Sequence, residues 1–212
     1  MSIPGKLHYN HTYIGNNYER LISYQAQLQY ATSYMKDPKI LIVGKGDGLI
    51  QEILFKNGYE ADVLDINKEL SPDILGSVDD IPIESNSYDI TLCCQVLEHL
   101  PFERFQLSIK ELYRVTKHKV VISLPDVRRF ISFRIQLFRY SFSYQISFHR
   151  LFPKKISNIR FEKMGHYWEI GYKGYPLKKI LALMQIDGWS VINTTRIYDL
   201  PWHLFIELEK GR

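Results

Sequence analysis

Apolar and polar residues follow one another along this chain in blocks that predict strands and helices in turn. Ile40 to Val43 form an uninterrupted apolar run, as expected for a central parallel strand that is buried on both faces. Residues 49–56 then show helical spacing, which ends at Asn57 and Gly58. The same alternation continues, with further strands expected at 60–65, 74–75, 88–94 and 119–124, and further helices at about 16–35, 102–115 and 176–186.

The C-terminal part predicts a closing hairpin of two strands, at 189–198 and 202–209. In the second strand, Ile206 and Leu208 alternate with Glu207 and Glu209, which predicts that one face is wet. Strands that alternate with helices favour an α/β protein with a parallel, doubly wound sheet.

The segment 127–161 differs from the rest because it has no acidic residue, while basic and aromatic residues interleave along it. Phe130, Phe133, Ile135 and Phe138 have partly helical spacing. This pattern is compatible with a solvated basic face, an acidic or phosphorylated substrate, an anionic membrane surface or a nucleic acid. Nucleic acid is the least favoured of these, since no RNA-binding module accompanies the segment.

The composition changes this picture little. The chain has 212 residues, of which 45% are hydrophobic and 24% charged, with a net charge of +4, as in an ordinary globular domain. The two cysteines, Cys93 and Cys94, are adjacent in a strand and point to opposite faces, so we expect neither a disulfide nor a metal site. The first residues lack the apolar core of a signal peptide, and no apolar stretch has bilayer-spanning length, so a cytoplasmic protein is expected.

Glycines follow the first strand at positions 44, 46 and 48, and Asp65 ends the second strand about twenty residues later. Glycines allow close approach of the backbone to a ligand, and the carboxylate can accept both hydroxyls of a ribose. The pattern therefore predicts an adenosine-containing ligand. Leu49 stands where a dinucleotide-binding loop places its third glycine, which favours S-adenosylmethionine over NAD.

With four further segments, the chain resembles class I S-adenosylmethionine-dependent methyltransferases, in particular the type 11 group. The resemblance covers roughly residues 39–125, in the right order and with the right gaps. The segments that carry it are 40–48 (ILIVGKGDG), 63–66 (VLDI), 79–89 (DDIPIESNSYD), 94–99 (CQVLEH) and 111–115 (ELYRV). It implies a Rossmann-like fold with a mostly parallel seven-stranded sheet, an antiparallel C-terminal strand and helices on both faces.

The resemblance also implies the residues that hold the cofactor. The glycine loop would lie under the methionine portion, Asp65 would bind the ribose, and the stretch after the third strand would border the adenine. The implied contacts are Gly44, Lys45, Gly46, Gly48, Asp65, Ile66, Ser77, Val78, Asp79 and Gln95. Two positions depart from the family pattern, because Ile42 and Ser77 stand where many relatives carry acidic residues.

Methyl transfer to an alcohol or phenol needs a group that removes a proton, and a histidine is suited to this task. His99 follows the fourth strand, at the end where open α/β sheets form their sites, and His166 is the second candidate. The aromatic segment 165–176 around His166 is interpreted either as an acceptor-binding surface or as a plug that fastens the insertion to the sheet. The candidate acceptor contacts in it are Tyr167, Trp168, Glu169 and Tyr172.

We therefore expect S-adenosylmethionine-dependent methylation of a small-molecule or lipid- or sugar-linked acceptor, with O-methylation favoured. A cofactor-binding protein of weak or no activity and an RNA methyltransferase are the alternatives. The segment 127–161 also suggests peripheral membrane association or a phosphorylated substrate. One domain of four parts is expected: a helical cap (1–37), a cofactor-binding core (38–125), a lid and acceptor insertion (126–175) and a C-terminal helix with hairpin (176–212).

Overall fold

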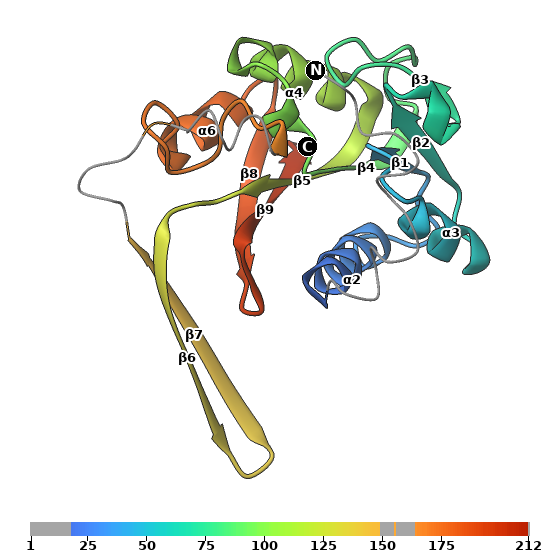
Figure 1. Ribbon diagram of the computed structural model, residues 1–212. Helices are drawn as coiled ribbons and strands as arrows, with labels where there is room; N and C mark the ends of the chain where they lie inside the picture. Colours follow the sequence, from blue (N-terminus) through green and yellow to red (C-terminus); the bar gives the residue numbers. More distant parts are fainter. Residues whose placement is uncertain (1–17, 149–154, 156–163, 212) are drawn as a thin grey trace.

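A seven-stranded sheet with the strand order β3-β2-β1-β4-β5-β9-β8 forms the centre of the protein (Figure 1). The structure, a computed structural model, describes residues 18–148, 155 and 164–211. Strand β9 pairs antiparallel with both of its neighbours, and the other pairs are parallel. The strands of this sheet are β1 Ile40–Val43, β2 Ala61–Asp65, β3 Ile74–Leu75, β4 Tyr88–Cys94, β5 Thr116–Pro125, β8 Trp189–Ile197 and β9 Leu200–Lys210.

Helices cover both faces of the sheet. Buried residues of α4 and α6 pack on one face and those of α2 and α3 on the other, in two hydrophobic clusters (Figure 1). The helices are α2 Tyr18–Thr32, α3 Leu49–Lys56, α4 Phe105–Val115 and α6 Leu177–Met184, with short 3-10 turns η2 Lys68–Leu70, η3 Leu97–His99 and η4 Phe102–Arg104. The predicted fold class is confirmed by this architecture and topology.

The central elements lie within a few residues of their predicted bounds, since β1, α3, β3 and β4 agree with the sequence pattern to the residue. The helix expected at 102–115 begins with the separate turn η4 and becomes α-helical only at Phe105. Parts of two expected features, residues 1–17 of the helical cap and residues 149–154 and 156–161 of the basic segment, lie outside the described residues.

The expectation of a wet face on the last strand is wrong at Glu207. Strand β9 lies inside the sheet, and the Glu207 carboxylate is buried and pairs with Lys119 of β5 at 2.6 Å. Tyr30 of α2 covers this pair, since its ring centroid lies 5.8 Å from the Lys119 ammonium. At Ile206, Glu207 and Leu208, both faces of strand β9 are therefore covered, and one of them contains the ion pair.

The basic segment contains a β-hairpin that projects from the body, made of β6 Arg129–Leu137 and β7 Tyr140–Phe148 (Figure 1). The partly helical spacing was therefore misleading, because Ile131, Phe133 and Ile135 also fit a period of two with polar residues between them. β-branched and aromatic residues favour strands, which accounts for the outcome.

Among the described residues, no helix combines the length and apolar character needed to cross a membrane. Both cysteines are free thiols, and Cys93 is fully buried in the core, as the position in β4 predicts.

Candidate functional site

The glycine loop after β1 has the conformation that a closely bound ligand requires. Gly44 has φ 87° and Gly48 has φ 80°, in the left-handed region that favours glycine. A Cβ atom at Gly44 would lie only 2.7 Å from Cγ2 of Val96, the residue that leads from β4 into η3. The loop backbone therefore passes tightly over the carboxyl ends of β1 and β4, where ligands bind in open α/β sheets.

Asp65 stands at the end of β2 and already accepts two backbone hydrogen bonds. Its Oδ2 accepts from the Lys45 N–H and its Oδ1 from the Asn67 N–H, both at 2.7 Å. Each carboxylate oxygen has a second lone pair, so both can still accept from a ribose hydroxyl. Ile66, the next residue, is 57% exposed and offers an apolar surface beside this carboxylate.

On the expected adenine side, Ser77 and Asp79 form one hydrogen-bonded unit. The Ser77 hydroxyl donates to the Asp79 carboxylate, and the Arg104 guanidinium pairs with the same group. Although burial acts to raise it, these hydrogen bonds hold the pKa of Asp79 below its usual value. Val78 lies between them and is buried. Ser77, which stands where many relatives carry an acidic residue, is thus hydrogen-bonded to the carboxylate of Asp79 two residues later.

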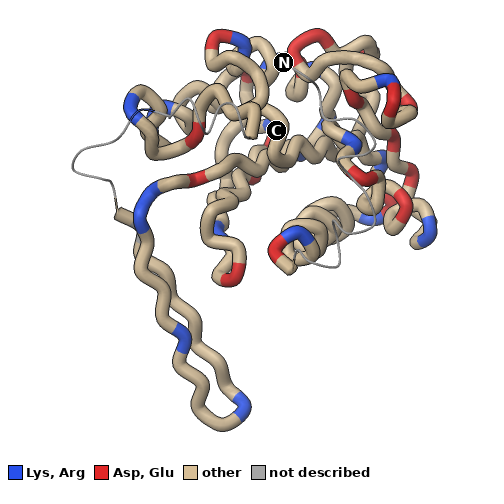
Figure 2. The backbone as a smooth tube through the Cα atoms, in the orientation of Figure 1, with Lys and Arg blue, Asp and Glu red and all other residues tan. Residues whose placement is uncertain are grey.

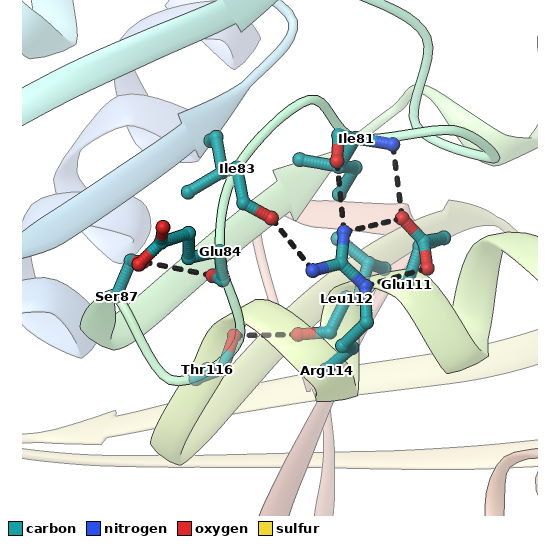
Figure 3. A network of polar contacts seen from close by, with 8 residues as sticks. All are labelled: Ile81, Ile83, Glu84, Ser87, Glu111, Leu112, Arg114 and Thr116. Atoms are coloured by element: carbon teal, nitrogen blue, oxygen red, sulfur yellow. Dashed lines mark hydrogen bonds and ion pairs between the residues drawn. The ribbon is translucent and has the colours of Figure 1, made fainter.

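A polar network from α4 fixes the loop that carries this unit (Figure 3). The Arg114 guanidinium donates to the backbone oxygens of Ile81, at 2.8 Å, and Ile83, at 2.6 Å. Glu111 pairs with Arg114 at 2.7 Å and accepts from the Ile81 N–H at 3.0 Å. The ELYRV segment therefore ties the adenine-side loop to the helix, a role that its sequence alone does not reveal.

Gln95 follows β4 in a left-handed conformation with φ 55°, which is uncommon for a residue with a side chain. Its backbone N–H and its Nε2 both donate to Ser123 of β5, to the carbonyl at 3.0 Å and the hydroxyl at 3.1 Å. Strained backbone of this kind gathers at functional sites, and Gln95 lies at the carboxyl edge beside the glycine loop.

Three residues at the glycine loop were missed by the sequence reasoning. Asp47 accepts from the Tyr24 hydroxyl at 2.6 Å and lies 3.7 Å from the Arg20 guanidinium, so α2 is fastened to the loop. An Arg20 nitrogen is 3.8 Å from the position of a Cβ built on Gly46. Asp47 could have been identified from its position between two glycines of the motif. Arg20 and Tyr24 could not, because they lie in a helix that is distant in sequence and carries no motif.

A second cluster lies after β4, where the two candidate histidines meet. The rings of His99 and His166 stack edge to face with their centroids 4.8 Å apart. His166 Nδ1 lies 2.7 Å from Glu169 Oε1, and His99 Nδ1 lies 3.3 Å from the Gly165 carbonyl oxygen. Glu98, which the sequence reasoning passed over, belongs to the same cluster. His99 and His166, which are 67 positions apart in the sequence, thus belong to one cluster.

The protonation of this cluster is shifted by its surroundings. Partial burial and the neighbouring His166 lower the pKa of His99 to about 4, so His99 is neutral at pH 7. Burial raises the pKa of Glu98 to about 8, and the charge of Glu169 adds to the effect. The group therefore contains a neutral imidazole that is exposed beside a fully buried carboxyl group.

The other candidate acceptor contacts divide between core and surface. Trp168 is fully buried against Phe102 and Phe105, and its Nε1 donates to the Leu100 carbonyl at 3.1 Å. This position favours the second interpretation for Trp168, a plug on the sheet. Tyr167 and Tyr172 are half-buried, and Glu169 is fully buried behind His166.

An open cavity of about 690 Å³ lies where β5 passes into the hairpin. Asp126, one of its lining residues, is almost fully buried and pairs with Arg128 at 2.7 Å and also with Arg196. Its lining residues are Asp126, Val127, Arg128, Arg129, Phe130, Ile131, Phe148 and Trp202. Gly171 packs closely against this cavity, since a Cβ there would lie 3.1 Å from the Arg128 backbone nitrogen.

Comparisons with known proteins agree with this geometry. Residues 41–124 match the sequence family described as "Methyltransferase domain". The fold is similar to the PH0226 protein from Pyrococcus horikoshii OT3, with a TM-score of 0.62, 12% identity and coverage of 96% of this chain and 95% of that chain. No curated protein matches this chain in sequence.

Two solved methyltransferases are also similar in fold. Magnesium protoporphyrin IX methyltransferase from Synechocystis PCC 6803, with bound S-adenosylhomocysteine, has 15% identity, a TM-score of 0.57 and coverage of 95% of this chain and 88% of that chain. A methyltransferase from Archaeoglobus fulgidus has 16% identity, a TM-score of 0.58 and coverage of 95% and 100%.

The sheet order and the similar solved structures define a class I methyltransferase fold, with the glycine loop and Asp65 at the carboxyl edge of its sheet. The match of residues 41–124 to the methyltransferase family adds the reaction class, and together with the similar folds it supports an S-adenosylmethionine-dependent methyltransferase with S-adenosylmethionine as its cofactor. The individual cofactor contacts remain the predictions made above.

Proposed function

We propose that this enzyme transfers the methyl group to a hydroxyl of an anionic, lipid- or sugar-linked small molecule. The cavity at the base of the hairpin carries the proposal, because it combines cationic and aromatic side chains beside the carboxyl end of β5. Acceptors in open α/β folds bind at this edge of the sheet.

The charges around the cavity favour an anion. Among the described residues, Asp126 is the one acidic residue that lines it, and both Arg128 and Arg196 pair with this carboxylate. Arg129 adds a further cation on the lining, so positive charge exceeds negative charge. Arginine recognises phosphate and carboxylate groups through two parallel hydrogen bonds.

The remaining lining favours an apolar portion in the same acceptor. Phe130, Phe148 and Trp202 contribute aromatic surface, and the Arg196 guanidinium lies 5.3 Å from the Phe130 ring centroid, which holds that ring in place. A molecule with a phosphate or carboxylate group and a hydrocarbon or ring portion would satisfy both halves of the cavity.

Activation of the hydroxyl is assigned to the histidine cluster. Methyl transfer from a sulfonium is an in-line displacement, so the protein has to align the hydroxyl oxygen with the methyl carbon while the proton leaves. His99 is neutral at pH 7 and exposed, so its imidazole can take that proton, and Glu169 orients His166 behind it.

The test uses S-adenosylmethionine labelled in the methyl group. The enzyme is incubated with a lipid extract, a water-soluble metabolite extract and an RNA fraction from cells that express it, and the label is followed through anion exchange. We expect label in an acidic component of the lipid extract. Label in RNA alone, in neutral metabolites alone, or in none of the three would contradict the proposed acceptor class.

A variant of the cavity sharpens this test. Trp202→Ala removes an aromatic wall that is 42% exposed, and it should lower transfer to the acceptor while binding of S-adenosylhomocysteine stays unchanged. His118→Ala, an exposed residue elsewhere on β5, is the matched control and should leave both unchanged. Equal transfer by the two variants would show that the acceptor binds elsewhere.

We also propose that the β6–β7 hairpin contacts an anionic membrane surface. One face of the hairpin is apolar on both strands. Each apolar residue of this face lies opposite another one, except Phe148, which lies opposite Arg129, and all of these apolar residues are exposed. The face consists of Ile131, Phe133, Ile135, Leu137, Tyr140, Phe142, Tyr144, Ile146 and Phe148. A contiguous apolar face of this kind on a soluble domain marks an interaction site.

The polar face of the hairpin is turned toward the protein itself. Arg134 pairs with Asp199 at 3.0 Å, and Gln145 donates to the Tyr198 carbonyl at 3.1 Å, both in the turn between β8 and β9. The apolar face is therefore left to an external partner.

The charges and the tip of the hairpin favour a lipid surface as that partner. Its charged residues, Arg129, Arg134 and Arg139, are all basic (Figure 2). Phe138 at the tip is 89% exposed and has φ 51°, a conformation that is costly for a bulky residue and usual for glycine. Basic and aromatic side chains together bind the interface of anionic bilayers.

Sedimentation with vesicles tests this contact. We expect the protein to bind vesicles of phosphatidylcholine mixed with phosphatidylglycerol, and to bind pure phosphatidylcholine more weakly. Phe138→Ser should reduce binding roughly tenfold or more, since burial of such a side chain contributes about 1.5–3 kcal/mol. Phe55→Ser on α3, where the phenylalanine is 78% exposed, is the control and should bind as the wild type does. A stable dimer that Phe142→Ser dissociates, with no vesicle binding, would assign the face to a second copy instead.

A further inference from the structure

Three side chains of the histidine cluster are arranged as ligands of a metal ion. Glu98, His99 and His166 each present one ligand atom, and these atoms lie within 4.8 Å of one another. Glu98 and His99 come from the turn η3 after β4, and His166 comes from the segment that packs against it through the hydrogen bond from the Tyr167 N–H to the Glu98 carbonyl, 2.8 Å long.

Both imidazoles are held by their Nδ1 atoms, which leaves the Nε2 atoms for the ligand. His166 Nδ1 lies 2.7 Å from Glu169 Oε1, and His99 Nδ1 lies 3.3 Å from the Gly165 carbonyl oxygen. A carboxylate or a backbone carbonyl behind a histidine is the usual second layer of a metal site, because it fixes the tautomer and the ring orientation. Glu169 and Gly165 supply one of each.

The Glu98 carboxyl group gives an independent indication. Its side chain is fully buried, and neither of its oxygens has a hydrogen-bond partner within the part of the chain that the structure describes. Buried carboxyl groups are normally paired, hydrogen-bonded or bound to a metal ion, since an unsatisfied one costs free energy. The two imidazoles are the groups beside it, and a cation between them would satisfy it.

We propose that Glu98, His99 and His166 bind a divalent transition-metal ion such as Zn²⁺, Co²⁺ or Mn²⁺. Two imidazole nitrogens and one carboxylate oxygen form the donor set of catalytic sites that keep open coordination positions. Bonds of about 2.0–2.2 Å to the ion would draw the three atoms slightly closer than they now stand, a movement that the exposed His99 can make.

The open positions give the ion a role in the proposed reaction. His99 is exposed, so the ion would face the side from which the acceptor enters, and the acceptor hydroxyl oxygen would occupy a free position. A bound cation would lower the pKa of that hydroxyl, whose proton would pass to solvent water, and the imidazoles would act as ligands instead of removing the proton themselves. This role rests on the proposed methyl transfer, whereas binding of the ion does not.

Cobalt is the probe for the test, because its visible absorption reports the number and type of ligands. The untagged full chain, freed of metal by a chelator, is titrated with Co²⁺ and then with Zn²⁺. We expect one equivalent of Co²⁺ to bind with an absorption band that Zn²⁺ abolishes. Glu98→Gln and His166→Gln should each weaken Co²⁺ binding on the order of 100-fold, because each removes a ligand.

His99→Ala keeps the test decisive if the buried variants fail to fold, because an exposed side chain can be removed without a cavity. It should lose the absorption band, while His118→Ala, the matched exposed control, should keep it. Binding of S-adenosylhomocysteine by every variant verifies the fold. Equal Co²⁺ binding by the wild type and His99→Ala would overturn the metal site. Co²⁺ binding without methyl transfer to any extract would leave the site in place and count against the proposed function.

Discussion

Replacement of Asp65 by alanine is expected to weaken the binding of S-adenosylmethionine and S-adenosylhomocysteine by roughly 100-fold or more. Hydrogen bonds to a charged group contribute about 1.5–3 kcal/mol each, and the carboxylate has a free lone pair on each oxygen for the two ribose hydroxyls. A loss of 1.4 kcal/mol corresponds to a factor of ten in the dissociation constant, so two lost bonds give this magnitude.

Calorimetric titration with S-adenosylhomocysteine measures the effect. Asp65 also accepts from the backbone of Lys45 and Asn67, so thermal unfolding should be recorded to separate lost binding from lost stability. Glu69→Gln removes an exposed acidic group four residues away and should bind like the wild type. Unchanged affinity in a folded Asp65→Ala variant would mean that the ribose lies elsewhere.

Replacement of Lys119 by methionine is expected to lower the free energy of unfolding by about 3–5 kcal/mol. Lys119 of β5 and Glu207 of β9 are diagonal neighbours on paired strands and are almost fully buried, so removal of the ammonium leaves a buried carboxylate without its counter-ion. Asn193 still donates to Glu207 at 2.9 Å but brings no charge. Chemical denaturation followed by circular dichroism gives the value.

The same strand supplies the control. Lys117 pairs with Asp89 at 2.9 Å, but its side chain is 41% exposed, so Lys117→Met should cost at most about 1 kcal/mol. The double variant Lys119→Met with Glu207→Leu should recover much of the lost stability, because both buried charges are then absent. Equal losses for Lys119→Met and Lys117→Met would contradict the buried pair.

The cofactor half of the protein could be predicted because its signals are local. A continuous apolar strand, a glycine-rich loop and an acid at the end of the next strand each follow from neighbouring residues. In the structure Gly44 has a positive φ and Asp65 ends β2, while their contacts with the cofactor stay predictions. Strand boundaries such as 88–94 are set by the same short-range pattern. Element positions in β1 to β4 therefore needed no tertiary information.

The parts that sequence reasoning missed depend on contacts between distant segments. The residues next to Arg20 in sequence do not predict that Arg20 lies close to the glycine loop. Those next to Glu98 do not predict that Glu98 lies beside His166. Glu207 was expected to be wet because the covering helix and its partner lysine lie far away in sequence. The hairpin was misjudged because its aromatic residues satisfy two periodicities at once.

The position of β9 between β5 and β8 also sets the order in which the sheet can be completed during synthesis. Strand β8 leaves the ribosome first, yet among the strands of the described sheet it pairs only with β9, so it has no place until residues 200–210 have emerged. Until then β5 is an edge strand with unpaired backbone groups, the kind of edge that recruits other chains. The nascent protein therefore passes through a stage in which its cofactor half is formed while its sheet is still open on one side.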